Sequence, residues 1–441
     1  MEQKFITLGA LTASTGANAS LGQGQAVALA EAHVNAALRR APYKGLTFSF
    51  IYGDSAGSGP VASTRAVEFR DQGIRGLVID LSAPATAVAE LNYDASPDND
   101  FFFPMQCSSC ASSTLNNPNA TNANPVTQAA LRNSLRWTFK ATMSAELIAK
   151  ALIRLLLLEG NNGDVNGDGI FKLGLFGTND VSGTAFLADL QTFGNQLHPT
   201  NILFESILIP STVNPSSYNY GADLARLADN MSASMVVEGF PDAIATYAVG
   251  ASTAAIINAH RNGGYTINLI GSQILRVPAV IQNLGNAANG YGGVSHVETD
   301  DPVSGEAFNT AFEAATGGPA FFRDSYYYDN AFTLMLAGLA ASSAVDDPSA
   351  ITGEEIRQGL LSINDPNGEV IHAGEDGFVR AIDAISEGRA INYEGASGPM
   401  DYDANLSVRN RLVRFVAENG RYVDVPPKLD CVTNDDCLPE S

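Results

Sequence analysis

A run of alternating polar residues, GDVNGDGIF at 163–171, has the spacing of a calcium-binding loop. The residues at its first, third, fifth and seventh positions are Asp164, Asn166, Asp168 and Ile170. The twelfth position is Leu175 instead of the glutamate that closes a helix–loop–helix site. We therefore expect residues 164–175 to hold a structural Ca²⁺ ion with a ligand from elsewhere in the fold. The alternative is a tight turn, which Asn, Asp and Gly also favour by themselves.

The four cysteines form two close pairs, Cys107 with Cys110 and Cys431 with Cys437. Two local disulfides in an oxidising compartment are the favoured interpretation. A four-thiolate zinc site and a redox-active Cys-x-x-Cys are the alternatives.

The segment GDSAG at 53–57 matches the G-x-S-x-G pattern of an esterase nucleophile, with Ser55 at its centre. Four histidines follow it in the chain: His198, His260, His296 and His372. None of them has an obvious acid–base setting, and no HGGG-type oxyanion loop precedes Ser55. An esterase is therefore a minor alternative, and we expect no catalytic activity.

The composition excludes several classes of partner. The 441 residues carry 47 acidic and 25 basic side chains, a formal net charge of −22. Nucleic acids and anionic lipids need clustered Lys and Arg, so neither is an expected partner. No apolar run reaches 18 residues, and we expect no membrane insertion. The chain begins MEQKFITLGALT and enters a strand at once, so we expect that a removed export signal has been replaced by a starting Met.

Strand-like and helix-like segments alternate in both halves of the chain. The expected strands lie at 4–11, 46–54, 75–83, 171–180, 201–210, 233–240 and 265–273. The clearest expected helices lie at 26–40, 61–73, 145–160 and 326–342. Such alternation predicts an α/β fold with parallel sheets covered on both faces. The expected strand ends are rich in Ser, Thr and Gly, which favours binding of a small polar ligand without chemistry.

Four segments carry a resemblance to a known family: 6–25, 76–86, 326–342 and YEGASGPMDYDANLSV at 393–408. In order and spacing they resemble the type I periplasmic binding proteins, specifically the branched-chain amino-acid (Leu/Ile/Val) receptors of ABC transporters. The last segment departs from the family's closing turn, because Leu406 replaces its final glycine. The YYYD run that opens the segment at 326–342 is either core or a stacking platform.

The resemblance implies two Rossmann-like lobes, joined by three hinge crossings, that close on a ligand in the cleft between them. The crossings are expected near residues 137–141, 294–298 and 394–399. The expected division is 1–138 and 296–394 for lobe 1, 139–295 and 395–426 for lobe 2, and 427–441 for a polar tail. A distant branch of this fold, the galactose-type receptors, carries a similar calcium loop.

The resemblance also implies a set of ligand contacts. In lobe 1 they fall on Leu21, Ser82, Ala83, Met105, Cys107, Ser108 and Ser109. In lobe 2 they fall on Asn179, Asp180, Glu238, Phe240 and Gln273. The serines would bind a carboxylate, and Glu238 or Asp180 an ammonium group. Leu21, Ala83 and Gln273 depart from the family's usual residues.

The expected function is that of a periplasmic, monomeric solute-binding protein. It would capture an amino acid or related carboxylate and deliver it to a membrane permease. The alternative on the same fold is a carrier or sensor for a hydrophobic ligand, such as a lipid or an aromatic compound.

Overall fold

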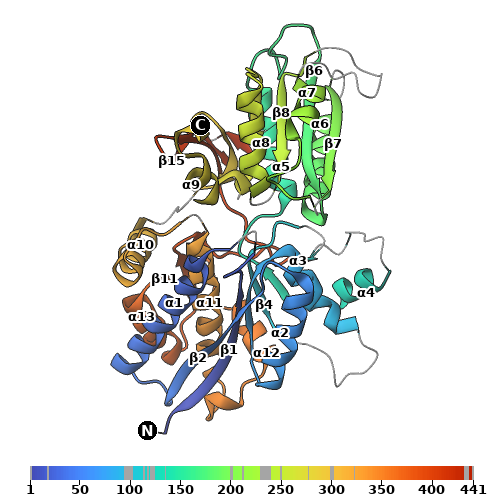
Figure 1. The fold of residues 1–441 in the computed structure, drawn as a ribbon. Helices are drawn as coiled ribbons and strands as arrows, with labels where there is room; N and C mark the ends of the chain where they lie inside the picture. Colours follow the sequence, from blue (N-terminus) through green and yellow to red (C-terminus); the bar gives the residue numbers. More distant parts are fainter. Residues whose placement is uncertain are drawn as a thin grey trace. The chain divides into compact units, whose positions relative to one another are not determined.

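The chain divides into two compact units, and each consists of two separate stretches of sequence (Figure 1). Unit 1 contains Met1–Met143 and Glu298–Arg409, and unit 2 contains Ser144–Val297 and Asn410–Ser441. The computed structural model describes residues 2–16, 19–93, 103–112, 115–116, 119, 125–134, 136–198, 202–210, 213–228, 240–248, 251–276, 278–297, 302–321, 323–431 and 437–439.

Unit 1 is built on a five-stranded parallel sheet. Its strands are β1 (Lys4–Thr12), β2 (Leu46–Asp54), β3 (Leu77–Leu81), β4 (Met105–Ser109) and β5 (Thr138–Lys140). They lie in the order β2-β1-β3-β4-β5, so the direction of winding reverses between β1 and β3. The sequence favours this sheet because most side chains of β1 and β3 are apolar, and strands buried on both faces require such runs.

Helices cover both faces of this sheet. The helices of unit 1 are α1 (Leu21–Arg40), α2 (Gly59–Asp71), α3 (Ser82–Ala89), η1 (Glu90–Tyr93), α4 (Pro125–Ser134), α10 (Pro302–Thr316), α11 (Asp324–Ser342), η6 (Pro348–Ala350), α12 (Gly353–Leu360) and α13 (Glu375–Ser386). On one face Leu8 and Val78 belong to a cluster with α1, α11 and α13. On the other, Ile79 belongs to a cluster with α2 and α3.

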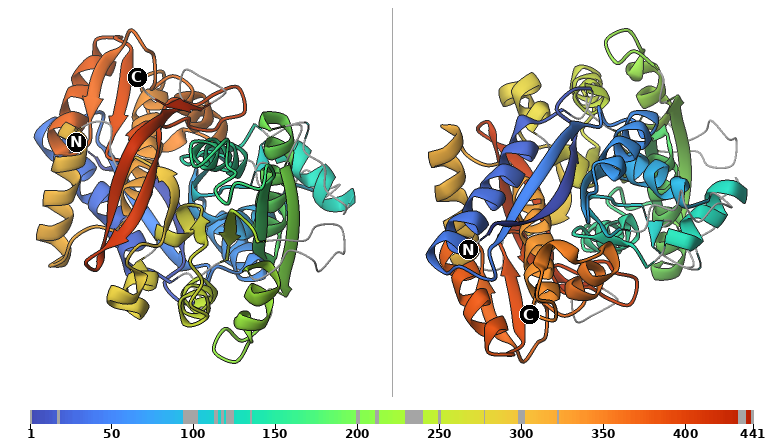
Figure 2. Two further views of the ribbon diagram at one scale, coloured as in Figure 1. Left: turned by 90° about the horizontal axis from the view of Figure 1, so that it is seen from above. Right: turned by 90° about the horizontal axis from the view of Figure 1, so that it is seen from below.

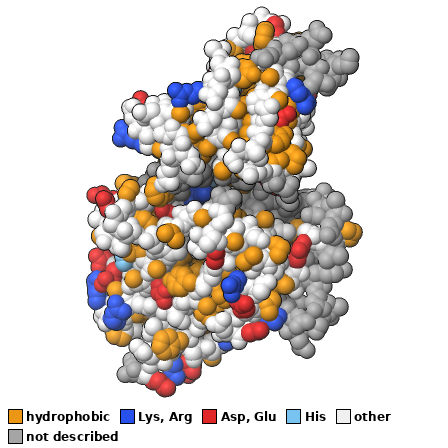
Figure 3. Space-filling model, viewed as in Figure 1, with side chains coloured by type: hydrophobic (Ala, Val, Ile, Leu, Met, Phe, Trp, Pro, Cys, Tyr) orange, Lys and Arg blue, Asp and Glu red, His pale blue; other side chains and the backbone are white. Residues whose placement is uncertain are grey.

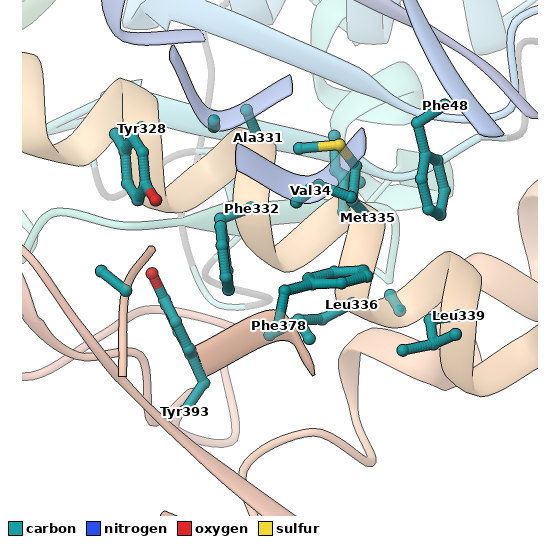
Figure 4. Packing of buried hydrophobic residues seen from close by; sticks show 14 of the residues in the cluster. Val34, Phe48, Tyr328, Ala331, Phe332, Met335, Leu336, Leu339, Phe378 and Tyr393 are labelled. Carbon is teal, nitrogen blue, oxygen red and sulfur yellow. The ribbon is translucent and has the colours of Figure 1, made fainter. Parts of the chain in front are cut away.

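Helix α11 is the centre of the larger cluster. Phe332 stacks on Tyr328 and on Tyr393, and it meets Phe378 edge to face (Figure 4). The tyrosines at 326, 327 and 328 are at most 1% exposed. The YYYD run is therefore core, and the stacking platform is excluded.

Asp329 on α11 joins two of the four segments that carry the family resemblance, 326–342 and 393–408. Its carboxylate accepts hydrogen bonds from the Tyr393 hydroxyl (2.7 Å), the Ala396 amide (2.9 Å), and the Ser397 amide and hydroxyl (2.6 and 2.5 Å). These bonds fix the turn after β12 (Ile391–Gly395), which lies between β11 (Glu369–His372) and β13 (Gly398–Pro399) in a small sheet. The tyrosine–aspartate helix motif therefore holds the Gly-Pro motif in place.

Unit 2 contains an eight-stranded sheet. Its strands are β6 (Phe171–Asn179), β7 (Ile202–Pro210), β8 (Ala243–Tyr247), β9 (Asn268–Gly271), β10 (Gly292–His296), β14 (Leu412–Glu418), β15 (Arg421–Asp430) and β16 (Leu438–Pro439). The parallel part has the order β7-β6-β8-β9-β10, which repeats the order in unit 1. Strands β14 and β15, the long pair coloured from orange-red to red in Figure 2, extend the sheet in antiparallel fashion.

The helices of unit 2 are α5 (Ala145–Leu157), α6 (Val181–Leu197), α7 (Tyr220–Ala228), α8 (Ala251–Asn262), η4 (Gln273–Arg276), α9 (Pro278–Leu284) and η5 (Gly285–Ala288). Phe176 and Ile244 of the sheet pack with Leu224 and Ile257 of the helices in the buried cluster of this unit. Among the described helices of the whole chain, none combines the length and apolarity that crossing a lipid bilayer requires.

Three details differ from the sequence-based expectation. The chain leaves unit 1 after Arg409, so residues 395–409 belong to unit 1, because the bonds to Asp329 hold the 396–397 turn there. The expected polar tail does not stand apart, because β15 and β16 join the sheet of unit 2. In the third strand of unit 2, β8 spans Ala243–Tyr247, whereas the expected strand at 233–240 lies outside the described residues except for Phe240.

The charged side chains on the visible face of unit 1 are interspersed in sign (Figure 3). Elsewhere in this unit the same pairing recurs, since Arg40 lies 2.8 Å from Glu375 and 2.7 Å from Asp376. The basic side chains of the visible face therefore lie among acidic ones and do not form a separate cluster on it.

Candidate ligand-binding site

The carboxyl ends of β1 and β3 define the candidate site in unit 1. In an open parallel sheet, ligands bind at the carboxyl edge where the winding reverses, and here that position lies between these two strands. The loops that start at this edge follow β1, β2, β3 and β4. Their side chains determine what the edge can bind.

The loop after β1 is fastened to the end of β2 by Asp54. Its carboxylate accepts hydrogen bonds from the amides of Ser14 (3.0 Å), Thr15 (3.3 Å) and Ala56 (2.9 Å), and from the Thr15 hydroxyl (2.5 Å). Desolvation raises the pKa of Asp54, but these hydrogen bonds outweigh it and hold the pKa at about 2. Asp54 is thus ionised and structural, and its carboxylate oxygens accept hydrogen bonds from the loop itself.

Asp80, near the end of β3, is fully buried and bonded to Ser55. The Ser55 hydroxyl donates to Asp80 Oδ2 at 2.5 Å, and the Leu81 amide donates to Oδ1 at 2.8 Å. Burial raises the pKa of Asp80 to about 6. Among the described residues no histidine bonds to Ser55, so the G-x-S-x-G segment lacks the base that a serine nucleophile needs.

The end of β4 carries a disulfide and two serines. Cys107 and Cys110 are bridged, as the spacing predicted, and the same holds for Cys431 and Cys437. Ser108 is buried and accepts a hydrogen bond from Asn330 Nδ2 at 2.8 Å. Ser109 is half-buried, and its hydroxyl lies 3.4 Å from Arg323 Nη1. The Cys-x-x-Cys segment therefore presents Ser109 at the edge of the sheet.

Arg323 and Asp324 stand at the start of α11, beside these strand ends. The Asp324 carboxylate is buried and accepts a hydrogen bond from the Phe321 amide at 2.9 Å. A Cβ atom at Gly22 would lie 2.4 Å from Asp324 Oδ2, so the first turn of α1 needs glycine there. Burial raises the pKa of Asp324 to about 6. The sequence did not single out either residue, because no motif surrounds them.

The other predicted contacts of unit 1 differ in position. Ser82 is buried at the start of α3, where its hydroxyl accepts a hydrogen bond from the Ser112 amide at 3.1 Å. Leu21 is 72% exposed at the start of α1, and Ala83 is also exposed. Met105 begins β4 and is buried in the core with Cys107, so the structure places Met105 away from the carboxyl edge.

At the carboxyl edge of unit 2, the predicted charged contact Asp180 is bonded to neighbouring residues of the fold. Asp180 caps α6, with Oδ1 accepting from the Ser182 and Gly183 amides (3.0 and 2.9 Å) and Oδ2 from the Thr178 hydroxyl (2.5 Å). Its neighbour Asn179 is exposed at the end of β6, and Gln273 is half-buried at the start of η4. Asp180, the predicted partner for an ammonium group, is thus engaged in a helix cap.

Arg276, on η4 after β9, is also committed to the fold of unit 2. Its side chain is 3% exposed, donates to the Ser295 hydroxyl at 2.7 Å and lies 2.8 Å from Asp424 on β15. The guanidinium also lies over the Phe415 ring. His296 at the end of β10 is fully buried, and burial lowers its pKa to about 3. The Arg276–Asp424 ion pair therefore anchors the antiparallel strand β15 to the rest of unit 2.

The two remaining predicted contacts of unit 2 are Glu238 and Phe240, and neither is seen at this edge among the described residues. Glu238 lies outside the described residues. Phe240 precedes β8, so it lies at the amino edge of the sheet, where it is 62% exposed. There it lines a hollow of about 520 Å³ together with Asn166, Asp242 and Tyr265.

The predicted calcium loop is closed by hydrogen bonds of its own. Asp164 accepts from the amides of Gly167 (2.6 Å), Asp168 (3.2 Å) and Gly169 (2.8 Å). Asn166 Oδ1 accepts from the Asp168 amide, and Asp168 Oδ1 from the Ile170 amide.

The charges around this loop leave calcium as a prediction. The buried Lys172 ammonium contacts Asp168 Oδ2, and Leu175 at the twelfth position is buried in β6. In the part of the chain that the structure describes, no three His, Cys, Asp or Glu side chains are grouped to hold a metal ion. These contacts fit a hydrogen-bonded turn better than a metal cage.

Solved structures share the whole fold at low identity. A solute-binding protein of an ABC transporter from R. palustris, in complex with benzoate, is 15% identical, with a TM-score of 0.65 and 95% of each chain covered. A leucine-binding protein from Thermotoga maritima is 15% identical, with a TM-score of 0.65, covering 96% of this chain and 98% of that one. At such identities these similarities show the fold alone.

A third structure and a family model extend this result. The branched-chain amino acid transporter substrate-binding protein from Streptococcus pneumoniae, in complex with isoleucine, is 14% identical, with a TM-score of 0.66 and coverages of 96% and 100%. No curated protein sequence matches the chain. The family model described as periplasmic binding protein matches residues 6–382, which include most of both units. The chain therefore belongs to the periplasmic binding protein family.

Proposed function

We propose that the protein binds a small organic solute in the periplasm and delivers it to the permease of an ABC transporter. The observation that carries this proposal is the carboxyl edge of the unit 1 sheet, where Ser82 follows β3 and Ser109 ends the neighbouring strand β4, 3.4 Å from Arg323. Family membership and the whole-chain similarity to transporter binding proteins support the transport role.

The proposed ligand is an amino acid or a related carboxylate. Hydroxyl and guanidinium groups donate hydrogen bonds to a carboxylate, and the similar structures hold isoleucine or benzoate. Because Asp180 is used as a helix cap, an acid without an ammonium group, such as an aromatic acid, is a specific second candidate.

Isothermal titration calorimetry tests this function. The protein is first unfolded in denaturant and refolded to remove any ligand that co-purifies. It is then titrated with leucine, isoleucine, benzoate and 4-hydroxybenzoate, and with neutral sugars and putrescine as uncharged and cationic solutes. We expect micromolar or tighter binding of at least one solute. A flat titration with every solute would refute the proposal.

We further propose that the protein acts without catalysis and as a monomer. Ser55 donates its hydroxyl proton to a buried aspartate and is itself buried. Hydrolysis of p-nitrophenyl acetate by the protein and by a Ser55→Ala variant should be equal. A loss of activity in the variant would restore the esterase hypothesis.

A further inference from the structure

We infer that Arg323 recognises the negatively charged group of the ligand and thereby restricts the solute to organic acids. The inference rests on the proposed function and specifies its substrate class. It comes from the surroundings of the Arg323 side chain, the conformation of its backbone and the chemistry of the adjacent serine.

The guanidinium of Arg323 has few partners. Its one hydrogen bond within the described residues is the 3.4 Å contact from Nη1 to Ser109 Oγ, and no described carboxylate lies within 4.0 Å of it. By contrast, the buried Arg276 and Arg357 each lie within 2.8 Å of an acidic side chain. A guanidinium has five N–H donors, so most of those of Arg323 remain for a ligand or water.

The backbone holds Arg323 in a costly conformation. Its φ angle is 90°, in the left-handed region that favours glycine. A non-glycine residue there persists only where the surrounding structure enforces it, and such residues cluster at ligand sites. Here the next residue, Asp324, is locked by Gly22 and the Phe321 amide, and the Arg323 carbonyl accepts from the Tyr326 amide at 3.0 Å. The fold thus fixes the start of this side chain firmly.

The competing explanation is that Arg323 only balances the buried carboxylates of Asp80 and Asp324. Both influence it electrostatically, yet each receives its hydrogen bonds elsewhere. Asp80 is bonded by Ser55 and the Leu81 amide, and Asp324 by the Phe321 amide. Balancing charge at a distance needs only a positive charge. Binding a ligand carboxylate, by contrast, needs the parallel N–H donors that a guanidinium provides beside the strand ends.

The neighbouring hydroxyl completes the recognition chemistry. A carboxylate accepts two parallel N–H bonds from a guanidinium, and Ser109 stands within reach to add an O–H donor. A carboxamide of the same shape lacks the charge and presents an NH₂ group to these donors. The site should therefore prefer an acid over its amide by roughly 10- to 100-fold.

The experiment compares matched acid and amide pairs by calorimetry. The probes are benzoate with benzamide, 4-hydroxybenzoate with 4-hydroxybenzamide, and leucine with leucinamide. The variants are Arg323→Gln, Arg323→Lys and the control Arg380→Gln. Arg380 is half-exposed and pairs with Glu369, so it provides a matched loss of one positive charge in unit 1.

We expect the unaltered protein to bind at least one acid roughly 10- to 100-fold more tightly than its amide. Arg323→Gln should weaken that acid at least tenfold and abolish the preference over the amide. Arg323→Lys should retain part of the preference, because lysine keeps the positive charge but lacks the two parallel N–H donors. Arg380→Gln should bind as the unaltered protein does. Thermal unfolding of each variant checks that it is folded.

Three outcomes overturn the inference. The first is an unchanged acid affinity in Arg323→Gln, and the second is equal binding of acid and amide by the unaltered protein. The third is binding of a sugar or of putrescine without binding of any acid, which would leave the proposed function standing. If no solute binds at all, the proposed function and the inference fall together. If Arg323→Gln fails to fold, the inference is tested by comparing acid and amide binding in the unaltered protein and in Arg323→Lys.

Discussion

In unit 1 the strand ends carry hydroxyl groups, and Arg323 beside them has no carboxylate within 4.0 Å among the described residues, whereas in unit 2 Asp180 and Arg276 bond to their own fold. The two parallel sheets share one strand order, so topology does not cause the difference. It arises from the strands beyond β10, because the antiparallel pair of unit 2 supplies Asp424 to Arg276. The same architecture can therefore use a charge for binding in one unit and for folding in the other.

The largest expected effect concerns the folding of unit 1. Replacing Asp329 with alanine leaves four buried donors without their acceptor, so we expect a loss of about 4 kcal/mol in the free energy of unfolding. The single tryptophan of the chain, Trp137, lies in unit 1, so its fluorescence during urea unfolding reports on this unit. Asp329→Asn, which keeps one carbonyl acceptor, should lose less. Equal stability of the alanine variant would contradict the structural role.

Arg276 provides the matching test in unit 2. Arg276→Met should lower the free energy of unfolding by about 3 kcal/mol, because it leaves Asp424 and Ser295 without their buried partner. Circular dichroism during urea unfolding measures the loss. Affinity for a ligand acid should stay unchanged, in contrast to Arg323→Gln. A stable variant with weakened ligand binding would reverse the roles given to the two arginines.

Acidification should affect the units differently. Burial raises the pKa values of Asp80, Asp324 and Asp329 in unit 1 to about 6. Between about pH 4 and pH 6 the folded state binds more protons than the unfolded state, so stability rises as pH falls through this window. From pH 7.5 to 5.0 each group should add roughly 1 kcal/mol.

In unit 2 an aspartate and two histidines oppose each other over the same range. Burial raises the pKa of Asp189 to about 7, but it lowers that of His296 to about 3 and also lowers that of His260. A lowered histidine pKa removes stability as pH falls below its unfolded value near 6.5, so unit 2 gains no net stability from acidification. Trp137 fluorescence should therefore give a higher urea midpoint at pH 5.0 than at pH 7.5. Asp80→Asn should reduce the rise, and a lower midpoint at pH 5.0 would be incompatible with these assignments.

The calcium loop tests whether unit 2 also binds an ion. If the loop holds Ca²⁺, EDTA should lower the melting temperature, since an ion at a hundred times its Kd stabilises the folded state by about 2.7 kcal/mol. Asp168→Asn should then melt alike with and without EDTA. An unaltered melting curve for the original protein would identify the loop as a turn held by its own hydrogen bonds, without an ion.

The smallest effect is expected at Leu406, where the sequence departs from the family. Its φ angle is 56°, in the left-handed region that a glycine adopts without strain. Replacing Leu406 with glycine would relieve this strain but would also remove the packing of its partly buried side chain against the core. Leu406→Gly should therefore change the free energy of unfolding by less than about 1 kcal/mol. A larger loss would show that the side chain matters more than the backbone.

Much of the framework was predictable because it depends on local pattern. The expected strand at 46–54 is β2 itself, and the long apolar helices were located from their composition. Strand β8 at Ala243–Tyr247, which pairs between β6 and β9, was not expected, because its five residues are a short run without a motif. The third crossing was misplaced because a Gly-Pro segment resembles a linker until its bonds to Asp329 are known.

The site was less predictable, because it depends on long-range contacts. Ser82, Ser108 and Ser109 were predicted as ligand contacts from the family resemblance, and as contacts they stay a prediction. Arg323 was missed, since its importance follows from a φ angle and from a serine more than 200 residues earlier in the chain. A lone arginine between phenylalanine and aspartate carries no pattern in sequence.

The division of unit 1 into two stretches also constrains its synthesis. Strand β5 ends at Lys140, but α11, which covers one face of the sheet, begins only at Asp324. A ribosome adding roughly 10 residues per second needs about 18 seconds to cross that interval. During this time the apolar face formed by Leu8 and Val78 lacks its covering helix. The nascent chain is thus a natural client for a chaperone, and unit 2 can complete its parallel strands before unit 1 closes its core.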